Sequence, residues 1–195
     1  MDGLQAWDES VVLWVRNHMS SPFLDVMAKG VSTLGNHGLI WILLGIAFMI
    51  WGTIKRNELW KWGVLFLFCL GTNSLLVNAF IKPWAERIRP YDQLGLDILI
   101  SPLRDFSFPS GHTAAAFVAV RIGYGINKSF GRCMLIFAVC MAFSRLYLAV
   151  HYPSDIIAGA FLGWGWTYLI LFLIKAMKKT SFGNNKKIAQ SKKKC

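Results

Sequence analysis

Charged residues are scarce in this chain. Only 16% of its 195 residues are Asp, Glu, Lys or Arg, whereas a soluble domain usually carries about 25%. Hydrophobic residues make up 55% of the sequence, and nine Trp and fourteen Phe suit lipid-facing helices and interfacial belts. The shortage of charge therefore argues against a soluble protein and favours a membrane protein, with length enough for one domain.

Two further absences narrow the class. None of the four cysteines forms a CxxC pair and three lie in apolar segments, which excludes a disulfide framework and a zinc site. These residues are Cys69, Cys133, Cys140 and Cys195. The opening segment Met1–Ser10 is acidic rather than basic, so we expect no cleavable signal peptide.

Acidic residues are outnumbered, and the formal net charge of +11 is unevenly placed. Eight lysines gather near the C-terminus, at positions 175, 178, 179, 186, 187, 192, 193 and 194. A basic tail can bind nucleic acid, but beside a long apolar segment it more often marks a cytoplasmic membrane flank. We therefore expect no nucleic-acid partner, and a disordered cytoplasmic tail over residues 179–195.

Five apolar segments are long enough, or nearly so, to cross a bilayer core, which takes about 20 helical residues. They are Gly38–Ile54, Trp60–Ile81, Ser110–Ile126, Cys133–Val150 and Ile156–Ala176. The third is the shortest. The pattern predicts an all-α, integral-membrane helical bundle with five firm spans.

The first 35 residues are predicted to add shorter helices. Trp7–Met19 alternates apolar and charged residues in a manner typical of a helix that lies in the membrane interface. Pro22 ends that segment, and Phe23–Leu34 then suits a short or tilted, partly embedded helix that stops at Gly35. Whether this region completes a sixth span is left open.

Basic residues in the connections set the orientation. Two loops are basic, around Lys55 and around Lys128, and they fall on the same side as the lysine-rich tail if all five segments cross. The positive-inside rule makes that side cytoplasmic. The outer side then holds Trp84–Pro109 and the turn His151–Ser154.

Ionisable groups at the outer helix ends form one constellation. They are Lys82, Arg89, His112, Arg145, His151 and Asp155, with Ser110 and Gly111 at a helix start. Singly, each has an ordinary explanation: a snorkelling cation, a helix cap or a structural His–Asp pair. Membrane-edge charges are costly, however, and their convergence on one side favours function.

Together these groups suit a phosphoryl group. Arg and Lys bind phosphate oxygens, and a helix N-terminus with a glycine offers free backbone N–H groups. One neutral histidine can attack phosphorus while another protonates the leaving oxygen. Asp155 follows His151 by four residues, so one helical turn can set its carboxylate against the imidazole.

Three motifs carry a family resemblance: Lys82-x6-Arg89-Pro90, Pro109-Ser110-Gly111-His112 and Ser144-Arg145-x5-His151-x3-Asp155. In this combination and order the sequence resembles the type 2 phosphatidic acid phosphatase superfamily, the lipid phosphate phosphatases. The resemblance covers residues 82–155 by motif and most of the chain by helical pattern, with residues 1–35 the weak part.

The resemblance implies a role for each matched residue. His151 would be the nucleophile that becomes phosphohistidine, His112 the general acid, and Asp155 the group that orients His151. The phosphate would be bound by Lys82, Arg89, Ser110, Gly111 and Arg145. No metal or other cofactor is expected. Arg87 and Asp105 stay outside this set, and Arg87 is weighed evenly as a substrate contact or an ordinary loop charge.

The predicted function is hydrolysis of a membrane lipid phosphate by a domain spanning residues 1–178 of a bacterial inner-membrane protein. Its site would face outward, which puts undecaprenyl diphosphate narrowly ahead of phosphatidylglycerophosphate, phosphatidate and lipid A. The loop Trp84–Phe108 and the N-terminal helices are expected to set that choice. A non-enzymatic transporter or scaffold that holds an anion is the rival class. Gly159 and Gly163 suit close helix packing, internal or in a dimer, so the oligomeric state is left open.

Overall fold

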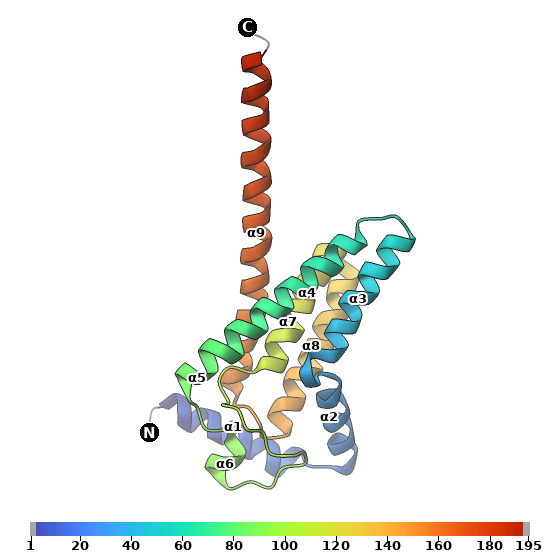
Figure 1. Cartoon of the computed structure of the whole chain (residues 1–195). Coiled ribbons are helices and arrows are strands. Elements are labelled where there is room, and N and C mark those ends of the chain that lie inside the picture. The colour runs from blue at the N-terminus through green and yellow to red at the C-terminus, as the bar shows by residue number, and fades with distance from the viewer. Residues whose placement is uncertain (1–2, 193–195) are drawn as a thin grey trace.

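The chain is a bundle of helices, seen here in a computed structural model that describes residues 3–192, with side chains through Lys179 (Figure 1). No strand occurs within that part, which confirms the predicted all-α class. The helices are α1 Gly3–Met19, α2 Pro22–Leu34, the 3-10 turn η1 Asn36–Gly38, α3 Leu39–Ile54, α4 Leu59–Leu75, the π-helical turn η2 Leu76–Ile81, α5 Lys82–Ala85, α6 Pro90–Leu94, α7 Gly111–Ile126, α8 Lys128–Tyr147 and α9 Pro153–Lys192.

Four stretches of the described chain are helical, long enough and apolar enough to cross a membrane: Asn36–Ile54, Leu59–Leu94, Lys128–Tyr147 and Pro153–Lys179. The fifth predicted span, Ser110–Ile126, forms the 16-residue helix α7 and falls short of a full crossing by length. The count of five spans is therefore not confirmed.

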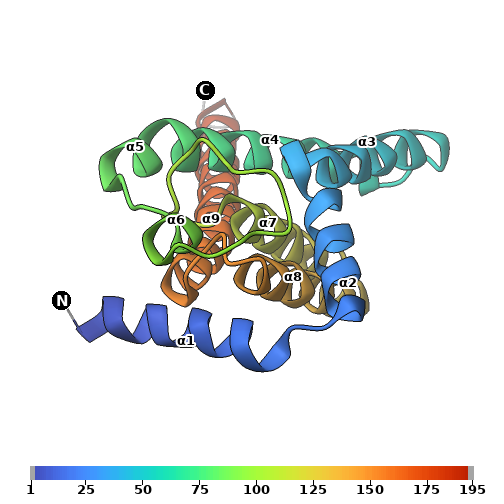
Figure 2. The same cartoon turned by 90° about the horizontal axis from the view of Figure 1, so that it is seen from below.

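Helix α7 is the centre of the bundle. It packs mainly against α8 and α9 and also touches α4, so most of its residues meet protein rather than lipid (Figure 2). Large apolar side chains are instead exposed on the outer helices, as at Trp51 on α3, Phe68 on α4 and Phe161 on α9. This division suits a bundle whose outer helices face lipid.

Two glycines let α9 approach α7 closely. A Cβ atom built on Gly159 would lie 2.5 Å from the Ser110 carbonyl oxygen, and one on Gly163 would lie 2.1 Å from that of Ala114. Both contacts are within one chain. The Gly159 and Gly163 pair therefore serves internal packing, which was one of the two roles predicted for it.

The N-terminal helices gather at one end of the bundle. Helix α1 lies across that end beside α6, and α2 packs along α8 (Figures 1 and 2). Neither helix reaches 18 residues, so neither adds a candidate span. Whether α1 lies in the membrane interface stays a prediction.

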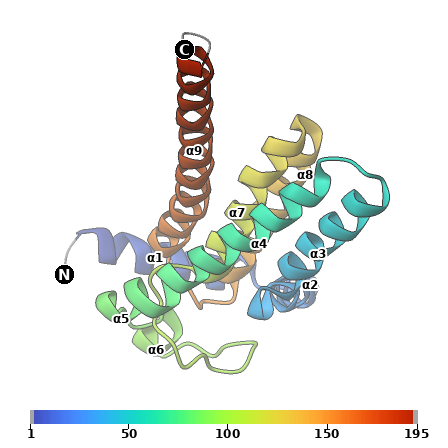
Figure 3. The ribbon, with the colours of Figure 1, turned by 45° about the horizontal axis from the view of Figure 1, so that its top comes forward.

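The two basic connections lie together at the opposite end. The turns between α3 and α4 and between α7 and α8 both point away from α1 (Figures 1 and 3). The long helix α9 stands apart from the bundle in its C-terminal part. Which side of a membrane each end faces stays a prediction.

Helix α9 is continuous to Lys192 in the described part of the chain. The disordered cytoplasmic tail expected over residues 179–195 stays a prediction. Residues 193–195 lie outside the described part of the chain.

The close approach of α7 and α9 gives a first prediction. Gly163→Val should lower the free energy of unfolding of the detergent-solubilised protein by about 1–3 kcal/mol, and with it the unfolding temperature, because the added carbons overlap the backbone of α7. Gly165→Val is the matched control, since a Cβ atom there meets nothing within 4 Å. Equal unfolding temperatures for the two variants would show that the α7–α9 contact does not limit stability.

Candidate active site

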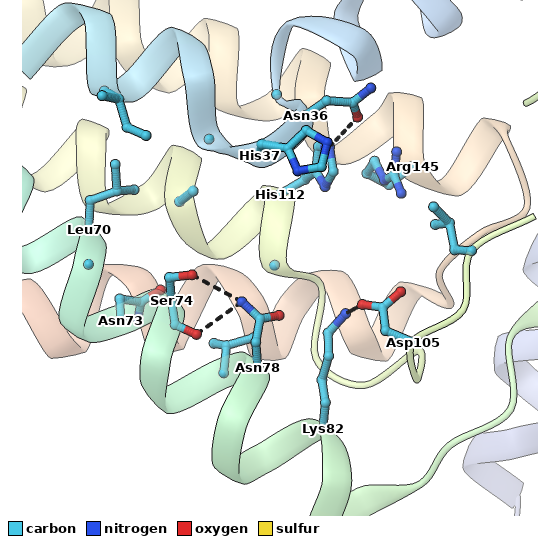
Figure 4. A pocket seen from close by; sticks show the side chains of 18 of the residues that line it. Asn36, His37, Leu70, Asn73, Ser74, Asn78, Lys82, Asp105, His112 and Arg145 are labelled. Carbon is cyan, nitrogen blue, oxygen red and sulfur yellow. Dashed lines mark hydrogen bonds and ion pairs between the residues drawn. The ribbon is translucent and has the colours of Figure 1, made fainter. Parts of the chain in front are cut away.

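A cavity of about 770 Å³ opens at the end of the bundle near α5 and α6. Five of the predicted site side chains line it: Lys82, Arg89, His112, Arg145 and His151. In Figure 4, His112 and Arg145 face Lys82 across open space. The structure thus brings together residues that are up to 69 positions apart in the sequence.

Lys82 and Arg89 share one carboxylate, that of Asp105. Lys82 Nζ donates to Asp105 Oδ2, and Arg89 Nη2 donates to Asp105 Oδ1 at 2.7 Å. Both cations are buried, whereas the side chain of Asp105 is 52% exposed. Partial burial alone would raise the pKa of the Asp105 carboxyl, but the hydrogen bond from Lys82 and the charges of both cations lower it to about 2. An ionised Asp105 therefore pairs with both cations.

Further bonds hold Arg89 in place. Its Nε donates to the backbone oxygen of Asp105 at 2.8 Å, and its Nη1 donates to that of Val150 at 2.7 Å. The same Nη1 lies 3.5 Å from Nε2 of His151. Arg89 therefore links the loop before α7 to the turn that carries His151.

Arg145 reaches the cavity from the last turn of α8. Its side chain is almost wholly buried, and Nη1 donates to the Ser32 hydroxyl on α2. Nε has no hydrogen-bond partner among the described residues. A buried guanidinium with an unused donor beside a cavity is suited to an anion, because leaving such a donor unpaired is costly.

His151 lies in the short turn between α8 and α9, with Nε2 toward the cations and Nδ1 toward Asp155. Asp155 Oδ2 is 3.6 Å from Nδ1, and the Ser107 hydroxyl, 3.5 Å from Nδ1, donates to the same oxygen at 2.5 Å. Burial first, and then Arg89 and the other cations, hold the pKa of His151 well below its usual 6.5. The imidazole is therefore neutral, as a nucleophile requires.

His112 and Gly111 begin α7 at the cavity wall. His112 Nε2 lies 3.3 Å from Oδ1 of Asn36, on the turn η1. A Cβ atom on Gly111 would meet only ordinary contacts, so this backbone stands open to the cavity. Ser110 differs from the prediction in position: its hydroxyl is buried, accepts from Thr113 and caps α7 without lining the cavity.

Sequence reasoning gave Arg87 and Asp105 no definite role, and gave none to Asp8. Arg87 donates to Asp155 Oδ1 at 2.5 Å and to Asp8 Oδ2 at 2.6 Å, which ties the N-terminal helix to the site. A signal for Asp8 was available, because Asp8, Val12 and Val15 share one helix face and an acid among buried apolar residues needs a partner.

A polar row leads from the cations into the cavity along α4 and η2. Asn73, Ser74 and Asn78 line the cavity on the same side as Lys82 (Figure 4). Asn78 Nδ2 donates to the Ser74 hydroxyl and carbonyl, both at 3.0 Å, whereas the buried Nδ2 of Asn73 has no partner among the described residues. The opposite wall carries Asn36 from η1. Polar side chains therefore line the cavity beyond the three cations.

Similarity to known proteins identifies the family to which this chain belongs. The profile of the PAP2 superfamily matches residues 62–179, which is more than half of the chain and includes all three motifs. The chain belongs to the PAP2 superfamily. The predicted family resemblance is confirmed.

Several PAP2 proteins are similar over most of the chain. Phosphatidylglycerophosphatase B of Bacillus subtilis is 33% identical over 79% of this chain and 75% of its own length. The undecaprenyl-diphosphatase of Sulfolobus acidocaldarius is 36% identical over 60% of this chain and 55% of its own length. The crystal structure of a transmembrane PAP2-type phosphatidylglycerolphosphate phosphatase from Bacillus subtilis covers 90% of this chain and 88% of its own, with a TM-score of 0.74 and 27% identity.

These PAP2 relatives and the apolar helices mark the chain as a bacterial membrane protein and a phosphatase hydrolase. The names of the relatives cover several lipid substrates. The relatives therefore support a phosphatase and leave the lipid open.

Asp105 gives a prediction about anion binding. Asp105→Asn should tighten inhibition by inorganic phosphate by about tenfold, because the anion no longer competes with a carboxylate for Lys82 and Arg89. Asp92→Asn, an exposed acid on α6, is the control and should leave the inhibition constant unchanged. Weaker phosphate inhibition in Asp105→Asn would contradict the competing role.

Proposed function

We propose that this protein hydrolyses a phosphate ester of a membrane lipid through a phosphohistidine on His151, with phosphatidylglycerophosphate the foremost substrate. One observation carries the proposal: three cations and two imidazoles line one cavity beside an open helix N-terminus. Fixed positive charge in a site sheltered from water stabilises the equatorial oxygens of a phosphoryl group in flight.

In the first step His151 Nε2 attacks phosphorus and the bond from phosphorus to the lipid oxygen breaks. His112 gives a proton to that departing oxygen, and the arrival of an anionic phosphate beside His112 favours its protonated form. The positive charge that develops on His151 is stabilised by Asp155 behind Nδ1.

In the second step water replaces the lipid. His112, now neutral, takes a proton from water as the oxygen of that water attacks phosphorus. The bond between His151 and phosphorus breaks, inorganic phosphate leaves, and the two histidines return to their starting protonation states. Lys82, Arg89 and Arg145 hold the same oxygens in both steps, so no other source of positive charge is required.

The polar row supports a glycerolipid as the substrate. Asn73 precedes Lys82 by nine residues, which is roughly 13 Å along a helix. A glycerolipid carries phosphodiester and ester oxygens at such a distance from its terminal phosphate, and the amide of Asn73, which lines the cavity, can donate to them. A polyprenyl chain offers only hydrocarbon there, and would leave this donor unpaired.

This order of preference differs from the one predicted from an outward-facing site, which put undecaprenyl diphosphate narrowly first. Similarity to phosphatidylglycerophosphatase B over 79% of the chain favours the glycerolipid. The relative described as an undecaprenyl-diphosphatase keeps the polyprenyl lipid as the second candidate. An outward-facing site, inferred from the basic connections at the opposite end, suits either lipid.

His151 tests the chemistry. His151→Ala should lower phosphate release by at least about a thousandfold, because its nucleophile is gone, while the lipid still binds through the three cations. The variant is expressed in a host that lacks its own lipid phosphatases and is then purified. Its turnover is measured with EDTA present. Full activity in this variant would overturn the phosphohistidine assignment, and lack of phosphate release by the wild type on any lipid would favour the non-enzymatic class.

Asn73 tests the lipid. Asn73→Leu should lower kcat/KM for phosphatidylglycerophosphate by about tenfold, because one hydrogen bond is lost. The kcat/KM for undecaprenyl diphosphate should stay within about twofold of the wild-type value. Asn17→Leu, an exposed amide on α1, is the control and should change neither value. If the wild-type enzyme hydrolyses only the polyprenyl diphosphate, the proposed glycerolipid substrate is wrong, whereas the proposed phosphatase activity stands.

A further inference from the structure

Helix α1 carries one acid on its apolar face. Asp8 is fully buried and lies at helical spacing from Val12 and Val15, whose side chains pack into the end of the bundle. A buried carboxylate is costly unless it is paired, so its partners show what it does.

Both oxygens of Asp8 are paired with residues beside the catalytic turn. Oδ1 accepts from the backbone N–H of Ser154 at 2.9 Å, and Oδ2 accepts from the Ser154 hydroxyl and from Arg87 Nη2. Gln5, one turn earlier on α1, accepts from the same Nη2 at 2.7 Å. Helix α1 is therefore fastened to the start of α9 and to Arg87.

Arg87 passes this contact on to Asp155. Its Nη1 donates to Asp155 Oδ1 at 2.5 Å and to the Ser154 hydroxyl at 2.7 Å. Its guanidinium also lies 4.1 Å over the ring of Tyr152. The other oxygen of Asp155 accepts from Ser107 and from the Tyr152 N–H, so the carboxylate beside His151 is fixed on both sides.

Behind His151 lie three charged side chains of alternating sign: Asp155, Arg87 and Asp8. Asp155 is next to His151, Arg87 is next to Asp155, and Asp8 is next to Arg87. Without Asp8, the cation of Arg87 would offset the carboxylate that has to stabilise a charged His151. With Asp8 present, the row keeps a net negative charge.

We propose that Asp8 and Arg87 are positioning residues of the active site, through which helix α1 fixes Asp155 and preserves the negative charge that Asp155 presents to His151. The proposal rests on the function proposed above for His151. Neither residue lines the cavity, so neither is expected to touch the phosphate. The charged and titratable groups that surround His151 from the other elements are Lys82, Arg89, Asp105, His112 and Arg145.

The sign of the charge gives the test. Neutral His151 is the attacking form, so kcat/KM falls on the acid side as His151 gains a proton. Asp8→Asn removes a negative charge and should move that acid limb to lower pH by about half a unit or more. Arg87→Gln removes a positive charge and should move the limb to higher pH by a similar amount, and the double variant should lie between them.

Each single variant should also lose on the order of tenfold in kcat, with KM little changed, because Asp155 is less well fixed and the phosphate cations are intact. Glu86→Gln is the matched control: it removes an exposed carboxylate next to Arg87 in sequence, where solvent and salt screen the charge. Its acid limb and kcat should match the wild type.

The outcomes separate the two proposals. Acid limbs that stay at the wild-type pH, or that move in the same direction in both variants, overturn the role of Asp8 and Arg87 while leaving His151 as nucleophile. Full turnover in His151→Ala overturns the proposed function itself.

If either variant is too unstable to purify, Arg87→Lys carries the test. It keeps the positive charge and loses the fork that bridges Asp8 and Asp155. The acid limb should then stay at the wild-type pH while kcat falls on the order of tenfold. A wild-type kcat in Arg87→Lys would overturn the positioning role.

Discussion

Three positive charges line one cavity, and the repulsion between them is the constraint on which the rest of the site depends. Neighbouring groups have to offset that repulsion. Lys82, Arg89 and Arg145 are all almost fully buried. Each is held by a group from a distant segment: Asp105 for the first two and Ser32 for the third. Buried cations are favourable only when anions or hydrogen-bond acceptors offset them, and Asp105 supplies that charge for Lys82 and Arg89. The unpaired Nε of Arg145 shows that the compensation is incomplete among the described residues, which is the basis for proposing that this cluster binds phosphate.

The bundle is built to carry that cluster. Small residues at Gly159 and Gly163 bring α9 against α7, which sets the start of α7 beside the turn that carries His151. The backbone N–H of Ser110 donates to the carbonyl oxygen of Asp155 at 3.0 Å, so the two motifs are linked directly. Helix α1 closes the end of the bundle through Asp8. The short central helix and the crosswise N-terminal helix thus both contact the segment that carries His151 and Asp155.

Much of this site could be predicted from the sequence because its members are charged residues at membrane edges, where charge is costly. The cavity does bring Lys82, Arg89, His112, Arg145 and His151 together. The pairing of Arg87 with Asp8 could not be predicted, because 79 residues separate them and a single sequence does not show which helix faces meet. Ser110 matched a motif by type, yet its hydroxyl is used to cap α7.

The fold was predictable to a similar depth. Hydrophobic length alone predicted five spans, whereas the described residues contain four helical stretches of that length, because α7 ends after 16 residues. The charge of the lysine-rich tail predicted disorder, which stays a prediction, while α9 is continuous to Lys192 in the described chain. Length and charge describe the environment of a segment, and packing decides its final form.

The stereochemistry of the reaction at phosphorus tests the central claim most directly. A substrate whose phosphate is made chiral with oxygen isotopes and sulfur would be hydrolysed by the wild-type enzyme, and the configuration of the released thiophosphate determined. Two in-line displacements, first by His151 and then by water, predict overall retention of configuration. Inversion would mean that water attacks the lipid phosphate directly, and would contradict a phosphohistidine intermediate.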